Sequence, residues 1–353
     1  VVVGMSGGVD SSVAAWLLKK QGYDVVGVTM QIWQDEEPEL QEENGGCCGL
    51  SAVDDARRVA AALEIPYYVM NFKKEFREKV IDYFTEEYRL GRTPNPCIAC
   101  NRYVKWEALL DRSLAIGADY IATGHYARVE RLENGRYALR RGAALAKDQT
   151  YALYSLTQEQ LKRTLMPVGE YSKDEIRRIA GEIGLNVASK PDSQDICFVP
   201  DGDYASFIEQ SSGQKPEPGN FVTADGKVLG QHKGIIHYTV GQRKGLGLAL
   251  GYPAFVLEIR PETNEVVIGT YEESLTKTLR AGSLSFMAVE DIREQIRAFA
   301  KIRYNHKGAW CTVERTGEDE ITCTFDEPIR AVTPGQAVVL YDGDYVLGGG
   351  TIW

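Results

Sequence analysis

Apolar and polar positions along the first half of the chain follow a pattern typical of strands and helices in alternation. Short apolar runs rich in β-branched and aromatic residues predict buried strands at 1–3, 25–32, 67–72 and 120–123. Between these runs, helical spacing of apolar residues predicts helices at 11–21, 52–63, 75–90 and 105–116. Strands separated by helices of this length predict an α/β domain with a doubly wound parallel sheet.

The pattern changes in the second half of the chain. A hairpin is predicted at 127–142 with its turn at Asn134-Gly135, and a later helix begins with a capping box, Ser172-x-x-Glu175. From Gly219 onward, short β-rich runs and polar turns predict two small β domains, of which the last is expected to be a β-barrel. The predicted domains are a catalytic domain with a C-terminal helical extension, a central β domain and the barrel, at 1–200, 201–277 and 278–353.

Composition narrows the class of protein. The 353 residues, 44% hydrophobic and 25% charged, predict a soluble globular protein of two or three domains without a membrane span. The net charge of −10 argues against a generally basic nucleic-acid binder. A basic stretch at 128–148 leaves open either a local RNA contact or a solvated hairpin face. Seven cysteines, an odd number in a long chain, favour the reducing cytoplasm over a secreted disulfide scaffold.

The first eighteen residues, VVVGMSGGVDSSVAAWLL, resemble a phosphate-binding loop between a strand and a helix. Adjacent glycines let the backbone approach a ligand, while serine hydroxyls and the helix N-terminus supply donors. No lysine closes the loop as in a Walker A motif, and Asp10 stands there instead. A carboxylate beside phosphates is reasonable if it holds Mg²⁺, which suits pyrophosphate release better than γ-phosphoryl transfer. The alternative is a capped turn without a ligand.

Two further stretches carry unusual cysteines. In GRTPNPCIACNRYVKW, residues 91–106, two prolines predict a rigid loop, and Cys97 and Cys100 form a C-x-x-C motif. Nearby cations and a helix start are expected to lower their thiol pKa values. Cys197 lies on another polar loop, and Cys311 and Cys323 fit buried apolar positions in alternating β-runs. The residues alone leave open a redox pair, part of a zinc or iron–sulfur site, or buried thiols; they assign no role to Cys47 and Cys48.

Taken together, these motifs closely resemble those of the bacterial tRNA-specific 2-thiouridylases, a family of PP-loop (N-type) ATP pyrophosphatases. The resemblance extends over essentially the whole chain. It rests on GMSGGVDSS (4–12), GRTPNP with a following CN, ATGHY (122–126), KDQ-x-Y (147–151), the loop around Cys197, TVGQRKGLG (239–247), KIRY (301–304), TPGQ (333–336) and LGGG (347–350). A PP-loop alone would indicate only the superfamily, whereas this combination indicates the family.

The resemblance implies that ATP adenylates the 2-oxygen of wobble uridine 34 in the tRNAs for Lys, Glu and Gln, with release of pyrophosphate. A persulfide sulfur then replaces AMP. The implied cofactors are ATP and Mg²⁺, and the implied partners are the tRNA anticodon stem-loop and a cysteine desulfurase or sulfur-relay protein. The wobble base is expected to flip into the crevice beyond the strand ends.

The resemblance also implies roles for individual residues. Cys197 corresponds to the persulfide carrier, and Cys100 to the nucleophile that forms a disulfide with it. The implied ATP contacts are Gly4, Met5, Ser6, Gly7, Gly8, Val9, Asp10, Ser11, Met30 and Gly124. Asn95, Pro96 and Cys97 correspond to the loop that receives the target base. The implied tRNA contacts are His125, Lys147, Asp148, Gln149, Arg303, Tyr304 and Gln336.

One position departs from the family pattern. Well-known members have an aspartate where this chain has Cys97, so the acid–base role proposed for that aspartate does not transfer. An alternative is a [4Fe–4S] cluster held by Cys97, Cys100 and Cys197, with inorganic sulfide as the donor. Among other functions, a PP-loop amidoligase acting on a small molecule would leave these cysteines unused, and a redox-sensing RNA-binding module would leave the phosphate loop unexplained.

Overall fold

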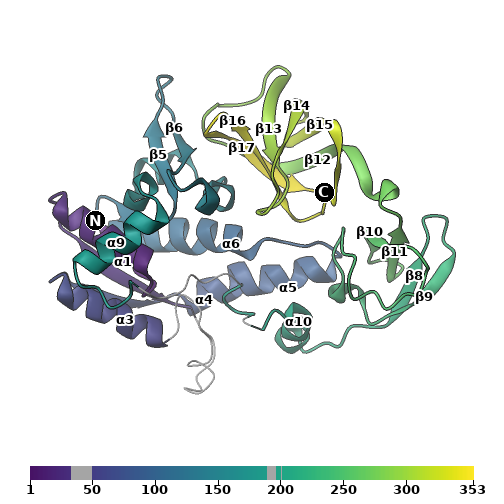
Figure 1. The fold of residues 1–353 in the computed structure, drawn as a ribbon, viewed down its shortest axis with the longest axis horizontal. Helices are drawn as coiled ribbons and strands as arrows, with labels where there is room; N and C mark the ends of the chain where they lie inside the picture. Colours follow the sequence, from purple (N-terminus) through teal and green to yellow (C-terminus); the bar gives the residue numbers. More distant parts are fainter. Residues whose placement is uncertain (33–49, 189–195, 200) are drawn as a thin grey trace. The chain divides into compact units, whose positions relative to one another are not determined.

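A computed structural model describes residues 1–32, 50–188, 196–199 and 201–353 (Figure 1). Cys47 and Cys48 lie outside the described residues. The chain folds into two compact units: the first comprises 1–80, 97–202 and 344–346, and the second comprises 81–96, 203–343 and 347–353. Among the helices of the described residues, none combines the length and apolar character that crossing a membrane requires. The limits of the three predicted domains stay a prediction.

A five-stranded sheet organises the first unit. Its order is β3-β2-β1-β4-β7, and each neighbouring pair is parallel. The strands are β1 (Val2–Gly4), β2 (Val26–Gln31), β3 (Tyr67–Asn71), β4 (Ile121–Ala122) and β7 (Thr164–Leu165). The chain leaves β1 toward β2 and β3, then crosses to the other side of β1 to form β4. The switch point therefore lies between β1 and β4, where such sheets bind their ligands at the carboxyl ends of the strands.

Helices cover both faces of this sheet. Val3 belongs to a buried cluster with residues of α1 (Val9–Lys20), α3 (Leu50–Ala62) and α9 (Lys173–Glu182). The next residue, Gly4, points the other way, and a side chain there would meet Leu109. Leu109 ends the π-helical segment Cys100–Leu109, which α7 (Leu110–Ala115) continues. The predicted doubly wound parallel sheet is therefore confirmed.

The segment around the C-x-x-C motif differs from the prediction. The sequence predicts a loop followed by a helix from 105, whereas helix α6 (Pro96–Ala99) begins at the second proline and leads directly into the π-helical segment. The physical reason is that proline suits the first helical position, because its φ is already helical and its missing N–H would have no partner there. Cys97 and Cys100 are therefore helical residues, one turn apart along the same helix.

The remaining elements of the first unit include the predicted hairpin, which is confirmed. Its strands β5 (Ala127–Arg131) and β6 (Tyr137–Arg141) are antiparallel, and Gly135 in the turn has a φ of +82°. The capping box at the start of α9 is also confirmed. The other helical segments are α4 (Lys73–Phe76), the π-helical Arg77–Ile81, α8 (Gln158–Lys162), and single turns at Leu145–Lys147, Thr150–Leu153 and Pro167–Glu170.

The second unit contains α5 (Asp82–Arg89), α10 (Tyr204–Ser212) and two β domains. The central domain has the sheet order β10-β11-β8-β9, and β12 pairs with both β15 and β17, so the C-terminal strands close into a barrel of order β12-β15-β14-β13-β16-β17. Two small β domains ending in a barrel are therefore confirmed. The strands are β8 (Gly219–Val222), β9 (Val228–His232), β10 (Phe255–Arg260), β11 (Glu265–Gly269), β12 (Leu275–Phe286), β13 (Ile296–Lys301), β14 (Ala309–Gly317), β15 (Glu320–Arg330), β16 (Ala337–Asp342) and β17 (Tyr345–Ile352).

Short helical turns complete the second unit at Ile235–His237 and Glu272–Ser274. The interior of the central domain is apolar, with Phe221 and Val256 fully buried. Cys311 and Cys323 are fully buried in the barrel, as their alternating setting predicts. These two thiols therefore behave as small apolar side chains of the barrel core.

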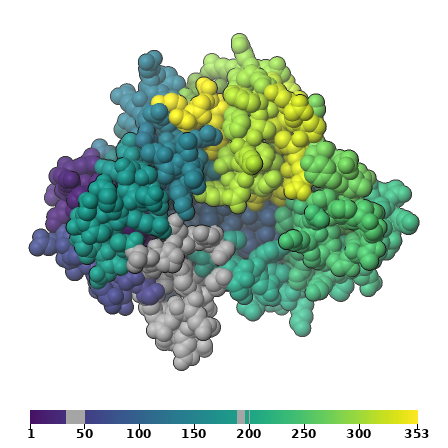
Figure 2. Space-filling model, viewed as in Figure 1, coloured from purple at the N-terminus to yellow at the C-terminus, as the bar shows by residue number. Residues whose placement is uncertain are grey.

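The loop after α5 is held against both β domains. The Thr93 N–H donates to the Pro334 carbonyl at 2.8 Å, and the Gln336 amide donates to the Thr93 carbonyl at 2.7 Å. The Thr93 hydroxyl lies 3.3 Å from that of Thr239 in the central domain. Three motifs quoted from the sequence, GRTPNP, TPGQ and TVGQ, thus meet in one place. The two β domains lie side by side in Figure 2, drawn in green and yellow.

Replacing Gln336 by leucine should loosen this loop, because the Thr93 carbonyl loses its side-chain donor. We expect the free energy of local opening to fall by about 1 kcal/mol, which corresponds to about fivefold faster hydrogen exchange at the Thr93 amide. Hydrogen exchange measured by mass spectrometry over 91–95 checks this. The exposed Gln210→Leu variant on α10 is the control and should exchange as the wild type does. Unchanged exchange in Gln336→Leu would show that the Gln336 amide does not hold the loop.

Candidate active site

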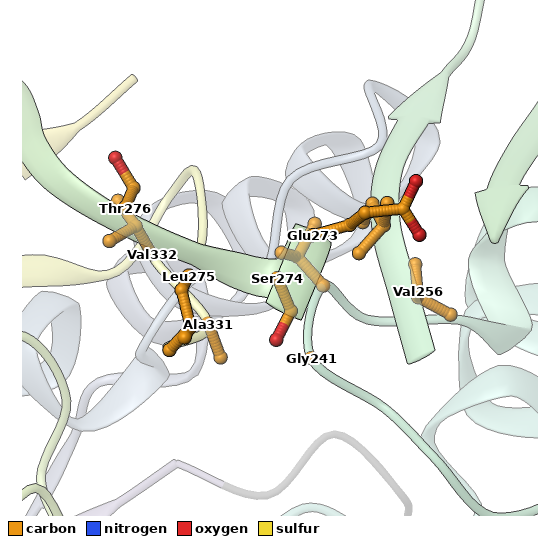
Figure 3. A pocket seen from close by; sticks show the side chains of 10 residues that line it. Gly241, Val256, Glu273, Ser274, Leu275, Thr276, Ala331 and Val332 are labelled. Atoms are coloured by element: carbon orange, nitrogen blue, oxygen red, sulfur yellow. The ribbon is translucent and has the colours of Figure 1, made fainter. Parts of the chain in front are cut away.

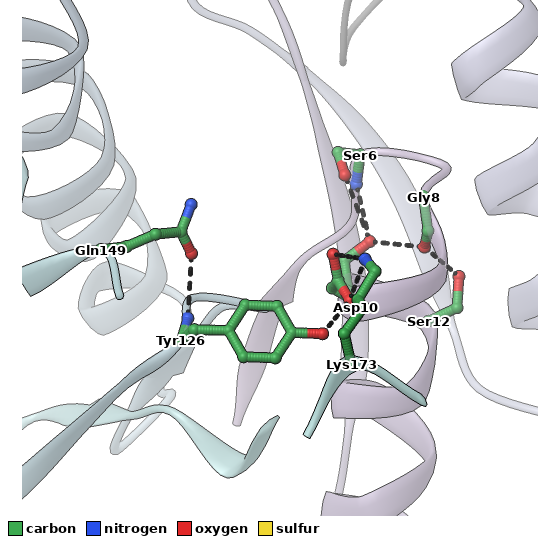
Figure 4. Close-up of polar contacts among 8 residues, drawn as sticks. Ser6, Gly8, Asp10, Ser12, Tyr126, Gln149 and Lys173 are labelled. Carbon is green, nitrogen blue, oxygen red and sulfur yellow. Dashed lines mark hydrogen bonds and ion pairs between the residues drawn. The ribbon is translucent and has the colours of Figure 1, made fainter. Parts of the chain in front are cut away.

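The turn between β1 and α1 is closed by its own polar groups (Figure 4). The Ser6 N–H donates to the Ser11 hydroxyl at 3.2 Å, and the Ser12 hydroxyl donates to the Gly8 carbonyl at 2.8 Å. Gly7 has a φ of +65°, and a Cβ there would lie 2.3 Å from the Ala52 carbonyl oxygen. The serine hydroxyls thus hold the loop in shape, and only glycine fits at its apex.

The loop that follows β4 lies against this turn. A Cβ on Gly124 would lie 2.6 Å from the Ser11 nitrogen and 2.7 Å from the Asp10 carbonyl carbon. The backbones after β1 and β4 are therefore in contact at the switch point of the sheet. Met30 lies near the carboxyl end of β2, the strand beside β1. The structure thus brings the residues predicted to contact ATP to one edge of the sheet; their contacts with ATP stay a prediction.

Two residues that the sequence does not single out as functional converge on Asp10. The Lys173 ammonium lies 2.8 Å from both carboxylate oxygens, and the Tyr126 hydroxyl donates to one of them at 2.6 Å (Figure 4). The Lys173 side chain is 11% exposed and that of Asp10 is 28% exposed. Lys173 is the first residue of α9, immediately after the capping serine, so the capping box marks its position without revealing its partner.

The donor set around Asp10 can be compared with the needs of Mg²⁺. Among the described residues, no group of three or more His, Cys, Asp or Glu side chains is placed to hold a metal ion. Mg²⁺ is usually bound through one or two carboxylates together with substrate phosphates, rather than by a cage of protein ligands. A single carboxylate beside a phosphate loop therefore fits Mg²⁺ that arrives with a nucleotide.

His125 follows Gly124 and turns into the protein. Its Nδ1 lies 2.7 Å from the Thr123 hydroxyl, and its ring centroid is 5.5 Å from that of Trp106. Burial lowers the pKa of His125 well below its ordinary value, and the Lys105 cation lowers it further. The imidazole is therefore neutral at pH 7. Its contact with RNA stays a prediction.

The other residues of the first unit predicted to contact tRNA already engage protein groups. Gln149 accepts the Tyr126 N–H at 2.9 Å, which links it to the residue that donates to Asp10. Asp148 accepts hydrogen bonds from Thr150, and its carboxylate is 9% exposed. Lys147 ends the helical turn before them. Gln149 therefore also supports the loop after β4.

All three chemically notable thiols belong to the first unit. Cys97 is exposed, and Cys100 and Cys197 are half-buried. The ring of Phe198, next to Cys197, packs edge-on against Phe76 at 5.8 Å. Among the described residues, these three thiols are not part of any group of three or more His, Cys, Asp or Glu side chains placed to hold a metal ion.

The second unit holds Asn95, Pro96 and the remaining predicted tRNA residues. Arg303 donates to the carbonyls of Arg330 and Ala331 at 3.2 Å, and Tyr304 is 40% exposed. Gln336, as described above, donates to Thr93. Their tRNA contacts stay predictions. This unit also contains a cavity of about 150 Å³, and none of the predicted site residues is among those that line it: Val240, Gly241, Val256, Leu257, Glu273, Ser274, Leu275, Thr276, Ala331 and Val332 (Figure 3).

The four histidines of the chain share one electrostatic property. Burial lowers the pKa of each below the ordinary 6.5, and for His306, beside Arg303 and Lys301, to about 4. Below pH 6.5 the unfolded chain therefore binds protons that the folded protein does not. The free energy of unfolding should fall as pH decreases from 6.5 toward 4 and should be insensitive to these groups above 6.5.

Urea unfolding midpoints at pH 7.5 and pH 5 measure this effect. His306→Gln should lose less stability between the two values than the wild type does, and Lys307→Gln, an exposed neighbour, should behave as the wild type. Equal acid sensitivity of His306→Gln and the wild type, or histidine ring protons that titrate at 6.5 by NMR, would contradict the expectation.

Comparison with known proteins gives three domain models that match this chain. They are described as a tRNA methyl transferase HUP domain (residues 1–201), a tRNA methyl transferase PRC-barrel domain (205–270) and an aminomethyltransferase beta-barrel domain (276–352). Among solved structures, a 4-thiouridine synthetase–RNA complex with bound ATP has 19% identity and a TM-score of 0.34, covering 60% of this chain and 50% of its own. That likeness is too low to bear on function.

Similarity to curated proteins extends over the whole chain. A tRNA-specific 2-thiouridylase MnmA from Lachnoclostridium phytofermentans is 70% identical, covering 100% of this chain and 99% of its own. Those from Carboxydothermus hydrogenoformans and Clostridioides difficile are 58% and 55% identical, again over 100% of this chain and 97% of theirs. The domain descriptions mention methyl transfer, but identity at this level over the full length decides the family. The chain belongs to the tRNA-specific 2-thiouridylase family.

Proposed function

We propose that this protein is an ATP-dependent sulfurtransferase that converts wobble uridine 34 to 2-thiouridine in the tRNAs for Lys, Glu and Gln. The observation that carries the proposal is the contact of Gly124 with Asp10 and Ser11. This contact brings a phosphate loop and a second strand end together at the switch point. The same unit holds Cys97, Cys100 and Cys197. An amidoligase that acts on a small molecule lies outside the family to which the chain belongs.

The first half of the reaction is an adenylation. The uracil 2-oxygen is a poor leaving group, and its attack on the α-phosphate of ATP converts it into an AMP ester while pyrophosphate departs. Residues 4–11, which include the N-terminus of α1, would contact the nucleotide phosphates, with Met30 and Gly124 as further contacts. Asp10 would hold Mg²⁺ together with the phosphates, and the bound ion would neutralise the charge of the departing pyrophosphate.

The second half transfers sulfur. A donor protein, a cysteine desulfurase or a relay protein, first loads a persulfide on Cys197. The terminal sulfur of this persulfide attacks C2, and AMP leaves with the former uridine oxygen. The Cys100 thiolate then attacks the Cys197 Sγ, so that the persulfide S–S bond breaks and its electron pair stays on the sulfur bound to C2. The products are 2-thiouridine and a Cys100–Cys197 disulfide, which an external thiol reductant must reduce before the next turnover.

Cys97 replaces the aspartate of well-known family members, so no acid–base step is assigned to it. Its exposure, together with its position one helical turn before Cys100, favours a place beside the target base, with Asn95 and Pro96. A [4Fe–4S] cluster would need all three thiolates, whereas the persulfide route needs only Cys100 and Cys197. We therefore favour the persulfide route over cluster-bound sulfide. We place the reaction in the cytoplasm.

Replacing either thiol should separate the two halves of the reaction. Cys100→Ser and Cys197→Ser should still release pyrophosphate in a tRNA-dependent first turnover, because adenylation uses neither thiol. Thiouridine formation should fall by at least about 10²-fold, since a serine at 197 carries no persulfide and a serine at 100 cannot attack the Cys197 Sγ as a thiolate does. Radiolabelled ATP follows pyrophosphate release, and nucleoside mass spectrometry follows 2-thiouridine.

Cys323→Ala, a buried thiol of the barrel, is the matched control and should retain thiolation. Thiouridine formation within about tenfold of the wild-type rate in either active-site variant would contradict the persulfide route. An iron assay on anaerobically purified protein separates the alternatives: active, iron-free protein supports the persulfide, and activity that requires iron overturns it.

Gly124→Ala should weaken ATP binding, because its Cβ would lie 2.6 Å from the Ser11 nitrogen and would force the two loops apart. A displacement on the order of 1 Å at such a site costs about 10²-fold in catalysis, and we expect the Kd for ATP to rise at least about tenfold.

The control for this variant is Gly181→Ala on α9, where a Cβ has no atom within 4 Å. It should leave the Kd for ATP unchanged and stabilise the helix by about 0.5–1 kcal/mol. Calorimetry with the full chain checks both variants. A Gly124→Ala protein that is folded and binds ATP as the wild type does would contradict the placement of ATP at this contact.

A further inference from the structure

The carboxylate of Asp10 poses an electrostatic problem for a phosphate-binding loop. A nucleotide triphosphate carries several negative charges, and a Walker A loop answers them with its own lysine. The GMSGGVDSS segment contains no lysine, and its acidic residue adds a further negative charge. In the structure this charge is balanced by Lys173, which lies 163 residues away in sequence. A lysine is therefore present at the loop, but it comes from another helix.

The ion pair is partly buried, and this increases its strength. Exposed ion pairs contribute little because water screens them, whereas screening falls as the groups leave solvent. The Lys173 ammonium is within 2.8 Å of both Asp10 oxygens and 5.6 Å from the centre of the Tyr126 ring, which gives it a favourable cation–π contact. Figure 4 shows Lys173 and Tyr126 both pointing toward Asp10.

The position of Lys173 is set by the fold rather than by the ion pair alone. Helix α9 buries Ile176, Ile179 and Ala180 in the same cluster as the apolar face of α1. Its capping box, formed by Ser172 and Glu175, fixes where the helix begins. Because Lys173 is the first residue of α9 and Asp10 is the second residue of α1, the packing of the two helices holds the starts of both in register.

We propose that Lys173 is the phosphate-binding cation of this site and that it changes partners when the nucleotide binds. Without nucleotide, its ammonium neutralises Asp10. When Mg–ATP binds, Asp10 turns to Mg²⁺, and the released ammonium donates to phosphate oxygens, including those of the pyrophosphate that departs. The change involves rotation of the Lys173 and Asp10 side chains. The inference rests on the proposed function, since it assigns a residue to the same ATP site.

If the Lys173–Asp10 ion pair had only a structural role, removal of Lys173 would have the opposite effect on nucleotide binding. If Lys173 only neutralises Asp10, it competes with Mg²⁺ for the carboxylate, and its removal should strengthen Mg–ATP binding. If Lys173 donates to the phosphates, its removal should weaken binding. Hydrogen bonds to charged groups contribute enough to stability that the loss should be about 10- to 100-fold in Kd. The sign of the change therefore distinguishes the two roles.

The experiment measures equilibrium binding of Mg–ATP, and separately of magnesium pyrophosphate, by calorimetry with the full chain and without tRNA. Lys173→Met should raise both Kd values about 10- to 100-fold, and Lys173→Arg, which keeps the charge and donors, should restore most of the affinity. Arg178→Met, which removes an exposed cation from the same helix, is the control and should bind both as the wild type does. Circular dichroism confirms that each variant is folded.

A second measurement tests the inference if the single variant Lys173→Met does not fold. In an Asp10→Asn background, which removes the carboxylate charge, adding Lys173→Met should still weaken pyrophosphate binding if the ammonium contacts phosphate. The inference is overturned if Lys173→Met causes no further loss of pyrophosphate binding in the Asp10→Asn background. It is also overturned if folded Lys173→Met binds Mg–ATP as tightly as the wild type or more tightly. If the wild type thiolates tRNA in that case, the proposed function stands alone. If the wild type never thiolates tRNA but Lys173→Met loses Mg–ATP binding, the assignment of Lys173 stands and the proposed function fails.

Discussion

The site depends on the close approach of the Gly124 backbone to Asp10 and Ser11. Parallel strands β1 and β4 bring these two loops to the same edge, but only a residue without a Cβ lets them touch. The contact places Tyr126, two residues after Gly124, within hydrogen-bond distance of Asp10. The packing of α9 against α1 then brings Lys173 to the same carboxylate. One charged centre thus depends on three features: the chain crossover between β1 and β4, the absence of a side chain at Gly124, and the packing of α9 against α1.

The parts of the fold that follow from local pattern could be read from the sequence. Apolar runs and their spacing predict the alternation of strands and helices that indicates a parallel sheet. Asn134-Gly135 predicts the hairpin and Ser172-x-x-Glu175 the capping box. Each of these signals lies within a short stretch of sequence. The start of α6 at Pro96 could not be located, since a proline in a polar segment is compatible with a rigid loop as well as with the first helical position. Only the packing of the folded chain decides between a rigid loop and a helix that begins at Pro96.

The ion pair of Lys173 with Asp10 had no sequence signal at all, because it joins the starts of two helices 163 residues apart. The same holds for the hydrogen bond from Gln336 to Thr93, which spans 243 residues. Motif resemblance points to both Asp10 and Gln336, yet it does not reveal what their side chains contact. Family membership therefore indicates the reaction, and the structure indicates how the charges and loops that serve it are held.

The central claim is that the uridine oxygen leaves as part of AMP and that sulfur takes its place. The most direct test uses a tRNA whose uridine 34 carries ¹⁸O at the 2-position, together with ATP and a persulfide donor, in a single turnover. Mass spectrometry of the products should find the label in the phosphate of AMP, in an amount equal to the 2-thiouridine formed. Thiolation with unlabelled AMP, or with the label in water or inorganic phosphate, would contradict the account.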